Sequence, residues 1–197
     1  MLYVTLDTNL LIDLEEKRKG FKKVLEILDL HNYGKIKICI PAIAASEKLL
    51  DAQHVPNYKL FEEYLSNLNI KNSEELMPLG IVGMCFVGHH LIAGNELVAL
   101  DHSIHRILFP NVEPEYRDFC EKRNIKLNGI HRRWRNAKID VQMLWCHIHY
   151  KKDIFITRDK NFKRKSNELN SKVCKVVIMT PHEFLEYSKH LAEQKNE

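Results

Sequence analysis

The hydrophobic pattern along the chain predicts short apolar strands separated by helices. Residues 2–6 form an apolar, β-branched run with little alternation, which is typical of a strand covered on both faces of a parallel sheet. Residues 35–40 alternate and are closed by Pro41, and residues 153–157 and 173–179 are two further strand-like runs. The order of these segments predicts an α/β fold with a central parallel sheet and helices on both faces.

Helical periodicity fills the intervals between the first strands. Residues 21–34 have the spacing of an amphipathic helix, and residues 57–67 predict another helix. From residue 42 to about residue 51, apolar side chains fall four residues before and three residues after Glu47. This spacing predicts that Glu47 lies on the apolar stripe of a helix that follows the second strand.

Two later segments carry clear helix signals. A helix that begins at a cap near Asn136 is apolar on much of its circumference, which predicts that it is buried. Asp140 would then lie in its first turn. Thr180 and Glu183 have the spacing of a capping box, with Pro181 at the first helical position, and they predict a final helix.

The segment 70–136 is longer than a simple crossover between two parallel strands requires. Its pattern predicts a helix at about 96–108 and another from near Pro114, so we interpret it as a mainly helical insertion in a single domain spanning 1–197. Residues 77–95 carry no formal charge and are long enough to cross a bilayer, but they contain a proline and four glycines. We expect a buried hydrophobic element here rather than a membrane span.

Net charge and cysteine content give only weak indications of the protein's partners and cellular compartment. The 197-residue chain has a net charge of +4, which is compatible with a polyanionic partner but does not indicate one. Its five cysteines are scattered without a CxxC pair, so they indicate neither a disulfide framework nor a zinc ribbon and favour the reducing cytoplasm. Because Asp7 and Asp13 interrupt any apolar N-terminal core, we expect no signal peptide.

Four acidic side chains stand at positions from which they can face one crevice. Asp7 and Asp159 follow the ends of two predicted strands, and chemistry in open α/β sheets gathers beyond those ends. Glu47 and Asp140 lie on predicted helices with apolar surroundings. Clustered carboxylates repel one another until protons, basic groups or bound cations relieve the repulsion. Oxygen ligands of this kind select Mg²⁺ or Mn²⁺, and such ions assist phosphodiester hydrolysis.

Each acid also has a structural explanation. Asp7 is a favourable helix N-cap, and an acid in a first helical turn, as predicted for Asp140, is stabilised by the helix dipole. Glu47 could pair with Lys48 or point to solvent, and Asp159 could be a turn residue. The recurrence of the same arrangement at four positions favours the functional interpretation.

These residues together resemble a PIN domain. The resemblance is carried by Leu6-Asp7-Thr8-Asn9, by Glu47, by Asp140 and by Thr157-Arg158-Asp159-Lys160-Asn161-Phe162, and it covers residues 1–68 and 137–190. It implies a three-layer α/β/α sandwich and an Mg²⁺- or Mn²⁺-dependent endoribonuclease. The acids that would bind one or two metal ions and carry catalysis are Asp7, Glu47, Asp140 and Asp159. The polar residues that would support them are Asn9, Thr157 and Asn161.

The resemblance also implies partners and a setting. PIN-domain toxins of bacterial toxin–antitoxin pairs belong to this family, so RNA is the expected substrate, an antitoxin protein and a second copy of the chain are candidate partners, and the location is cytoplasmic. The segment 70–136 has no counterpart in the more compact toxins. Two other readings stay open, namely a non-catalytic module that binds RNA or a protein, and a DNA-directed nuclease of the related flap type.

Basic side chains near two of the acids are candidates for substrate binding. Arginines before Asp140 could hold phosphates while an aromatic ring stacks on a base, and a second basic group follows Asp159. The alternative is a solvated run of charges that caps a helix. The candidates are Arg132, Arg133, Trp134, Arg135, Lys138, Arg158 and Lys160.

Overall fold

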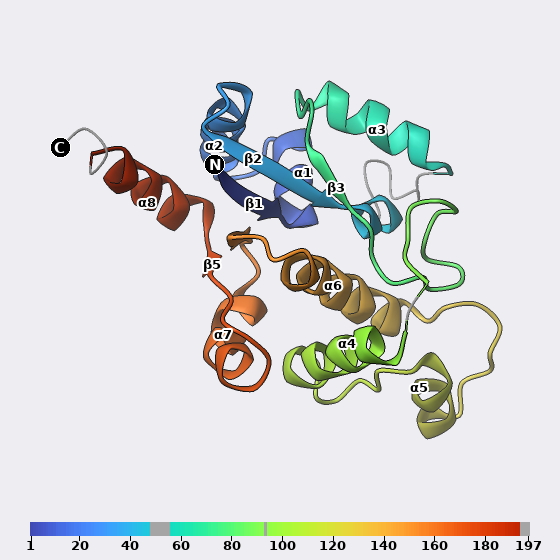
Figure 1. Ribbon diagram of the computed structural model, residues 1–197. Helices are drawn as coiled ribbons and strands as arrows, with labels where there is room; N and C mark the ends of the chain where they lie inside the picture. Colours follow the sequence, from blue (N-terminus) through green and yellow to red (C-terminus); the bar gives the residue numbers. More distant parts are fainter. Residues whose placement is uncertain (48–55, 93, 194–197) are drawn as a thin grey trace.

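The computed structural model describes residues 1–47, 56–92 and 94–193. Its centre is a five-stranded sheet in the order β3-β2-β1-β4-β5, in which all neighbouring strands are parallel (Figure 1). The strands are β1 (Leu2–Leu6), β2 (Ile36–Pro41), β3 (Glu74–Leu76), β4 (Ile154–Ile156) and β5 (Ile178–Met179). The predicted parallel α/β sheet is therefore confirmed.

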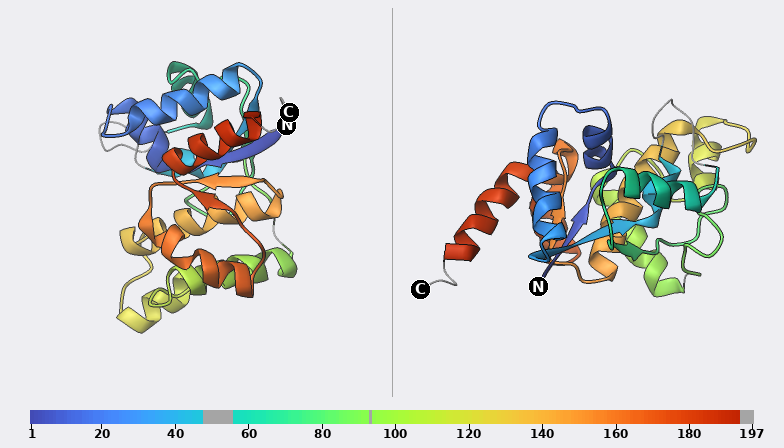
Figure 2. Two further views of the ribbon diagram at one scale, coloured as in Figure 1. Left: turned by 90° about the vertical axis from the view of Figure 1, so that its left-hand side faces the viewer. Right: turned by 90° about the horizontal axis from the view of Figure 1, so that it is seen from above.

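Helices cover both faces of this sheet, which makes the fold a three-layer α/β/α sandwich (Figures 1 and 2). One face carries α1 (Thr8–Glu15), α2 (Phe21–Asn32), α3 (Tyr58–Asn67) and α8 (Pro181–Glu193). The other face carries α6 (Arg132–His149) and α7 (Lys160–Lys172). Helix α4 (Asn95–Leu108) packs against α6 and α7 from outside, and α5 (Tyr116–Arg123) follows it.

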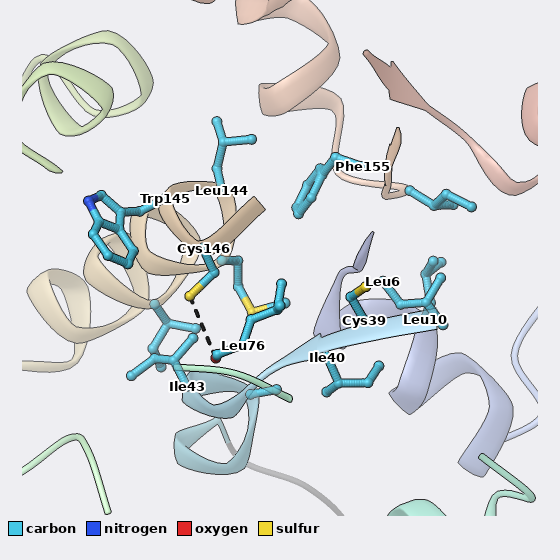
Figure 3. Packing of buried hydrophobic residues seen from close by; sticks show 14 of the residues in the cluster. Leu6, Leu10, Cys39, Ile40, Ile43, Leu76, Leu144, Trp145, Cys146 and Phe155 are labelled. Carbon is cyan, nitrogen blue, oxygen red and sulfur yellow. Dashed lines mark hydrogen bonds between the residues drawn. The ribbon is translucent and has the colours of Figure 1, made fainter. Parts of the chain in front are cut away.

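The interior between the sheet and α6 is buried and mainly apolar. The Phe155 ring of β4 contacts the His147 ring of α6, with ring centres 5.6 Å apart, and Cys39 of β2 and Cys146 of α6 are buried in the same core (Figure 3). The Cys146 thiol makes a weak hydrogen bond with the Leu76 carbonyl at 3.8 Å. Burying such side chains is the main favourable term in folding, and here it fixes α6 against the middle of the sheet.

The segment 70–136 contains the two predicted helices, α4 and α5, and in addition a strand that was not predicted. Its residues Glu74–Leu76 form β3, which adds to the edge of the sheet through pairs such as Cys39↔Glu74. A strand of three residues with two glutamates has no apolar alternation, and the open edge of β2 supplies its pairing. Because α4 packs on α6 and α7, this segment contributes to the sandwich itself.

Residues 77–92 do not form the expected buried element. They follow an irregular path in which Leu79 and Met84 are buried, whereas Val82, Val87 and Ile92 are 97%, 93% and 95% exposed. The glycines and the proline of this stretch favour turns over regular structure. No helix among the residues that the structure describes is long and apolar enough to cross a membrane.

The helix predicted after β2 is not formed where the structure describes the chain. Residues Ala42–Ser46 make a short 3-10 helix, η1, and Glu47 follows in an extended conformation. Ser46 is held by hydrogen bonds from outside its own helix: its hydroxyl donates to the Met84 carbonyl and its carbonyl accepts from Arg135 at 2.8 Å. Residues 48–55 of the predicted helix lie outside the described residues.

Helix α6 begins earlier than the sequence pattern predicts. The His131 ring accepts a hydrogen bond from the Arg133 N–H at 3.2 Å, so His131 rather than Asn136 is the N-cap. The basic run therefore forms the first turns of the helix. Asp140 lies in the third turn, so the prediction that it occupies the first turn is wrong.

The C-terminal part contains one unpredicted helix and one shortened strand. Helix α7 occupies residues between the third and fourth predicted strands, and β5 is only two residues long. The Asn170 side chain accepts from the Val176 N–H at 2.7 Å, which holds the chain in a loop before β5. The predicted capping box is confirmed, because Thr180 N–H donates to Glu183 at 2.7 Å and Glu183 N–H donates to Thr180 Oγ1 at 3.3 Å.

Candidate acidic site at the carboxyl ends of the strands

The site begins where β1 and β4 end side by side. Leu6 pairs with Ile156, and the Asp7 N–H continues the pairing by donating to the Ile156 carbonyl at 3.0 Å. This register brings Thr157 next to Asp7, whose side chain is buried with 4% exposed. The Thr157 hydroxyl donates to Asp7 Oδ2, and the Asn9 amide donates to the same oxygen at 2.5 Å.

Thr157 also connects Asp7 to Asp159. The Asp159 N–H donates to Thr157 Oγ1 at 2.9 Å, so one hydroxyl joins the two acidic residues. Asp159 Oδ1 accepts from the Asn161 N–H at 2.7 Å and caps α7. Asp159 thus has a structural role in addition to its place beside Asp7. The motif of threonine, any residue and aspartate has a physical meaning here, because it forms this bridge.

Glu47 and Asp140 approach from the other side. Helix α6 packs against η1 and β2, which brings Asp140 toward the ends of the strands. Burial raises the pKa of Asp140 well above its ordinary value, and the charges of Asp7, Glu47 and Asp159 raise it further. The other three acids therefore lie close enough to Asp140 for their charges to act on it.

Burial is also the main cause of the raised pKa values of Asp7 and Glu47. Burial raises the pKa of Asp7 to about 7, and the charges of Glu47 and Asp159 add to this while the hydrogen bond from Thr157 opposes it. Burial also raises the pKa of Glu47, against a hydrogen bond with the Thr8 side chain. Without a cation, the cluster thus retains protons at pH values where exposed acids are charged.

Helix capping and the helix dipole do not fully explain the positions of Asp7 and Asp140. Asp7 occupies the N-cap position of α1, but its side chain makes no capping hydrogen bond with the first turn, and it bonds to Thr157 and Asn9 instead. Asp140 is too far along α6 for the helix dipole to favour it. Among the described residues, no side chain or backbone group donates a hydrogen bond to it. Asp140 therefore lowers the stability of the folded protein, and a purely structural role for α6 does not explain why an acid stands at this position.

The predicted supporting residues behave differently from one another. The Asn9 amide nitrogen donates to Asp7 and to Thr157, while its Oδ1 is buried without a hydrogen-bond partner in the described part of the chain. The Asn161 side chain turns away and donates to the Leu108 carbonyl at 3.1 Å, so Asn161 supports Asp159 only through its backbone. The Thr8 hydroxyl next to Glu47 is a support that the sequence reasoning missed, although it stands within the first motif.

The basic candidates divide into exposed and buried groups. A groove of about 350 Å³ is lined by Glu47, Arg132, Arg135 and Asn136, so two arginines face the same space as one of the acids. Arg133 and Lys160 are exposed. Arg158 forms an ion pair with Asp13.

Trp134 and Lys138 do not fit the expected contact with a surface-bound substrate. They are 3% and 6% exposed, respectively. The Trp134 indole donates to the Glu113 carbonyl at 3.0 Å, and Lys138 forms an ion pair with the buried Asp101. The partner of Lys138 is 37 residues away along the chain, so no local sequence signal could have revealed it.

The donor chemistry of the site fits a hard divalent cation. All four acids offer oxygen ligands, burial and the neighbouring charges raise the pKa values of Asp7 and Asp140, and the buried Asn9 Oδ1 has no hydrogen-bond partner among the described residues. Within the described residues, no group of three or more His, Cys, Asp or Glu side chains forms a ready-made metal site. Mg²⁺ keeps several waters and often binds through one or two carboxylates, so it does not require all four acids to contact the ion.

Comparisons with known proteins add no relative. No protein-family model matches the chain, and no curated protein matches it significantly. The resemblance to PIN domains therefore stays a prediction that rests on the residues themselves.

Proposed function

We propose that this chain is a PIN-like endoribonuclease that hydrolyses RNA phosphodiester bonds with Mg²⁺ or Mn²⁺. One observation carries the proposal: Asp7, Glu47, Asp140 and Asp159 come from four separate parts of the fold, and their charges converge on Asp140. Clustered carboxylates of this kind are costly for stability, because each raises the energy of the others' charged forms. A bound cation would neutralise this repulsion, and the cluster would then serve as a metal-binding site.

The roles of the side chains follow from their surroundings. A divalent cation supplies Lewis-acid activation of water and offsets the charge that develops at a phosphate. Asp7 is the most buried ligand candidate, and Thr157 keeps it oriented through its hydroxyl. Glu47 combines a raised pKa with a place on the groove, so it is suited to accept a proton from the attacking water.

The arginines of the groove complete the proposal. Arg132 and Arg135 line the same space as Glu47, and cationic side chains there would position the phosphates of an RNA backbone. The Arg135 guanidinium is anchored on the Ser46 carbonyl, directly before Glu47. The toxin role, the antitoxin partner, the homodimer and the cytoplasmic location stay predictions.

A closed circle of single-stranded RNA tests the proposed activity, because only an endonuclease can open it. We expect the protein to linearise the circle in Mn²⁺ or Mg²⁺ and to leave it intact in excess chelator. A DNA circle of the same sequence should stay closed. An Asp29→Asn variant serves as a purification and activity control, because Asp29 is an exposed acid on α2, outside the proposed site.

Failure to cleave RNA with either metal would contradict the proposal and favour the non-catalytic module. Preferential opening of the DNA circle would instead favour a nuclease of the flap type.

A further inference from the structure

A second cavity lies between α6 and the segment 79–130. It has a volume of about 370 Å³, at the small end of the range for ligand pockets of roughly 300–1,000 Å³. Lys138 lines it, and this residue lies two positions before Asp140 in the same helix. Residues two apart point to nearly opposite sides of a helix, so this cavity is separate from the acidic site.

Two aromatic rings form a rigid wedge in the wall of the cavity. The ring centres of Tyr116 and Trp134 are 5.0 Å apart and the ring planes are inclined by 56°. Tyr116 donates to the Gly129 carbonyl at 2.5 Å and accepts from the His131 N–H at 3.0 Å. Because the Trp134 indole is also hydrogen-bonded, both rings are held in place before any ligand arrives.

Three polar side chains lie at the base of the same cavity. Asp101 accepts from Lys138 in an ion pair and from the Gln142 amide at 2.6 Å. Gln142 also accepts from the Leu79 N–H at 2.8 Å, and Lys138 donates to the Pro114 carbonyl at 3.3 Å. A buried ion pair is often no more stabilising than apolar side chains of the same volume, so stability alone gives no reason for this network.

The network retains capacity for a ligand. These hydrogen bonds use two of the three ammonium protons of Lys138 and one of the two amide protons of Gln142. The Asp101 oxygens keep free lone pairs within the described surroundings. Donors and acceptors beside an aromatic wall match the edge and one face of a nucleobase.

The cavity also adjoins the groove that leads to the acidic site. Ile130 lines both spaces. The groove carries Arg132 and Arg135, which suit a phosphodiester backbone running between the two. A single strand with its scissile phosphate near Glu47 could therefore place another of its bases in the cavity.

We propose that this cavity binds one base of a single-stranded RNA and thereby determines where the strand is cut. This inference rests on the proposed function, and it adds a specificity site to it. A free nucleotide carries the same base, so the experiment must distinguish a base within an RNA strand from a free nucleotide.

The first arm is a scan of one RNA substrate in which each residue in turn lacks its base. We expect a single abasic position, displaced from the cut, to lower kcat/KM at least tenfold. Abasic residues elsewhere outside the immediate site of cleavage should have little effect. This arm uses the unmodified protein, so it does not depend on the folding of a variant.

The second arm blocks the cavity with Val98→Phe, because Val98 lines it from α4. The matched control is Val87→Phe, since Val87 is exposed and lies outside the lining. With chelator present to prevent cleavage, uncleaved RNA should quench the fluorescence of Trp134. Val98→Phe should weaken this binding at least tenfold and make cleavage insensitive to the critical abasic position. Val87→Phe should do neither, and thermal unfolding verifies that both variants fold.

The outcomes separate this inference from the proposed function. RNA that is cleaved equally well at every abasic position would overturn the base-binding site while leaving the nuclease in place. Adenosine or guanosine monophosphate that quenches Trp134, with a flat abasic scan, would also overturn it and identify a free nucleotide as the ligand. RNA that binds in a Val98-dependent way without being cleaved would uphold the base site and contradict the nuclease.

Discussion

Replacement of Asp140 by Asn is expected to reduce RNA cleavage by about 100-fold or more while making the cation-free protein more stable. Loss of one preorganised charged group from a catalytic site typically costs at least that factor. The gain in stability arises because Asp140 is half-buried, is raised in pKa by three neighbouring acids and has no hydrogen-bond donor among the described residues. An amide of the same shape removes the repulsion.

The stability difference should depend on pH with a definite sign. Because folding raises the pKa of Asp140 above its ordinary value of 3.8, the folded protein holds this proton more tightly than the unfolded chain. Asp140 therefore opposes folding increasingly as the pH rises above about 4. We expect the Tm of Asp140→Asn to exceed that of the wild type at pH 8 in chelator, and the difference to vanish near pH 4.

Added Mn²⁺ should reverse that order, because the folded wild type binds the ion more tightly than the variant does and is therefore stabilised more. The control is again Asp29→Asn, which should change neither cleavage nor Tm appreciably. An Asp140→Asn protein that cleaves like the wild type, or that is less stable in chelator at pH 8, would contradict the assignment of Asp140 to a repelling cation site.

Replacement of Asp101 by Ala is expected to lower the free energy of unfolding by about 3–5 kcal/mol, the usual cost of removing one partner of a buried ion pair. Asp101 and Lys138 are 2% and 6% exposed. Without Asp101, the partners that the described residues leave to the Lys138 ammonium are the Pro114 carbonyl and the Trp134 ring, whose centre is 5.6 Å away. Urea denaturation with unchanged m values measures the loss.

A double variant gives the matched control for this prediction. Asp101→Leu combined with Lys138→Met removes both charges together, and such replacements are often neutral or stabilising. We expect the double variant to recover most of the stability lost by Asp101→Ala. A loss of less than about 1 kcal/mol in the single variant would place the pair in the range of exposed ion pairs and contradict its burial.

Much of the sheet and half of the site follow from the sequence. An unbroken apolar run predicts β1 and its burial, and adjacent parallel strands explain why Asp7 and Thr157 meet. The bridge from Thr157 to Asp159 needs only the backbone geometry that follows β4. The strand β1 and the positions of Asp7 and Asp159 at strand ends are local features that the pattern of residues predicts, whereas the contact between Asp7 and Thr157 joins residues 150 apart and depends on the strand order.

The other half of the site depends on contacts between distant residues. Glu47 is positioned after η1, where Arg135 and the Met84 carbonyl hold Ser46, and no helical period encodes this. The start of α6 was hidden because the cap is a histidine within a basic run. The strand β3 forms because β2 offers an open edge, and its own residues show no strand pattern.

The most direct test of the account is calorimetric titration of the wild type with Mn²⁺ at pH 7, in two buffers of different ionisation enthalpy. Because the pKa of Asp7 is raised to about 7, binding at this pH should release protons and make the measured heat depend on the buffer. The same titration of Asp140→Asn should give binding at least tenfold weaker. Absence of binding at millimolar Mn²⁺, or equal binding by the variant, would contradict a cation site built from converging acids.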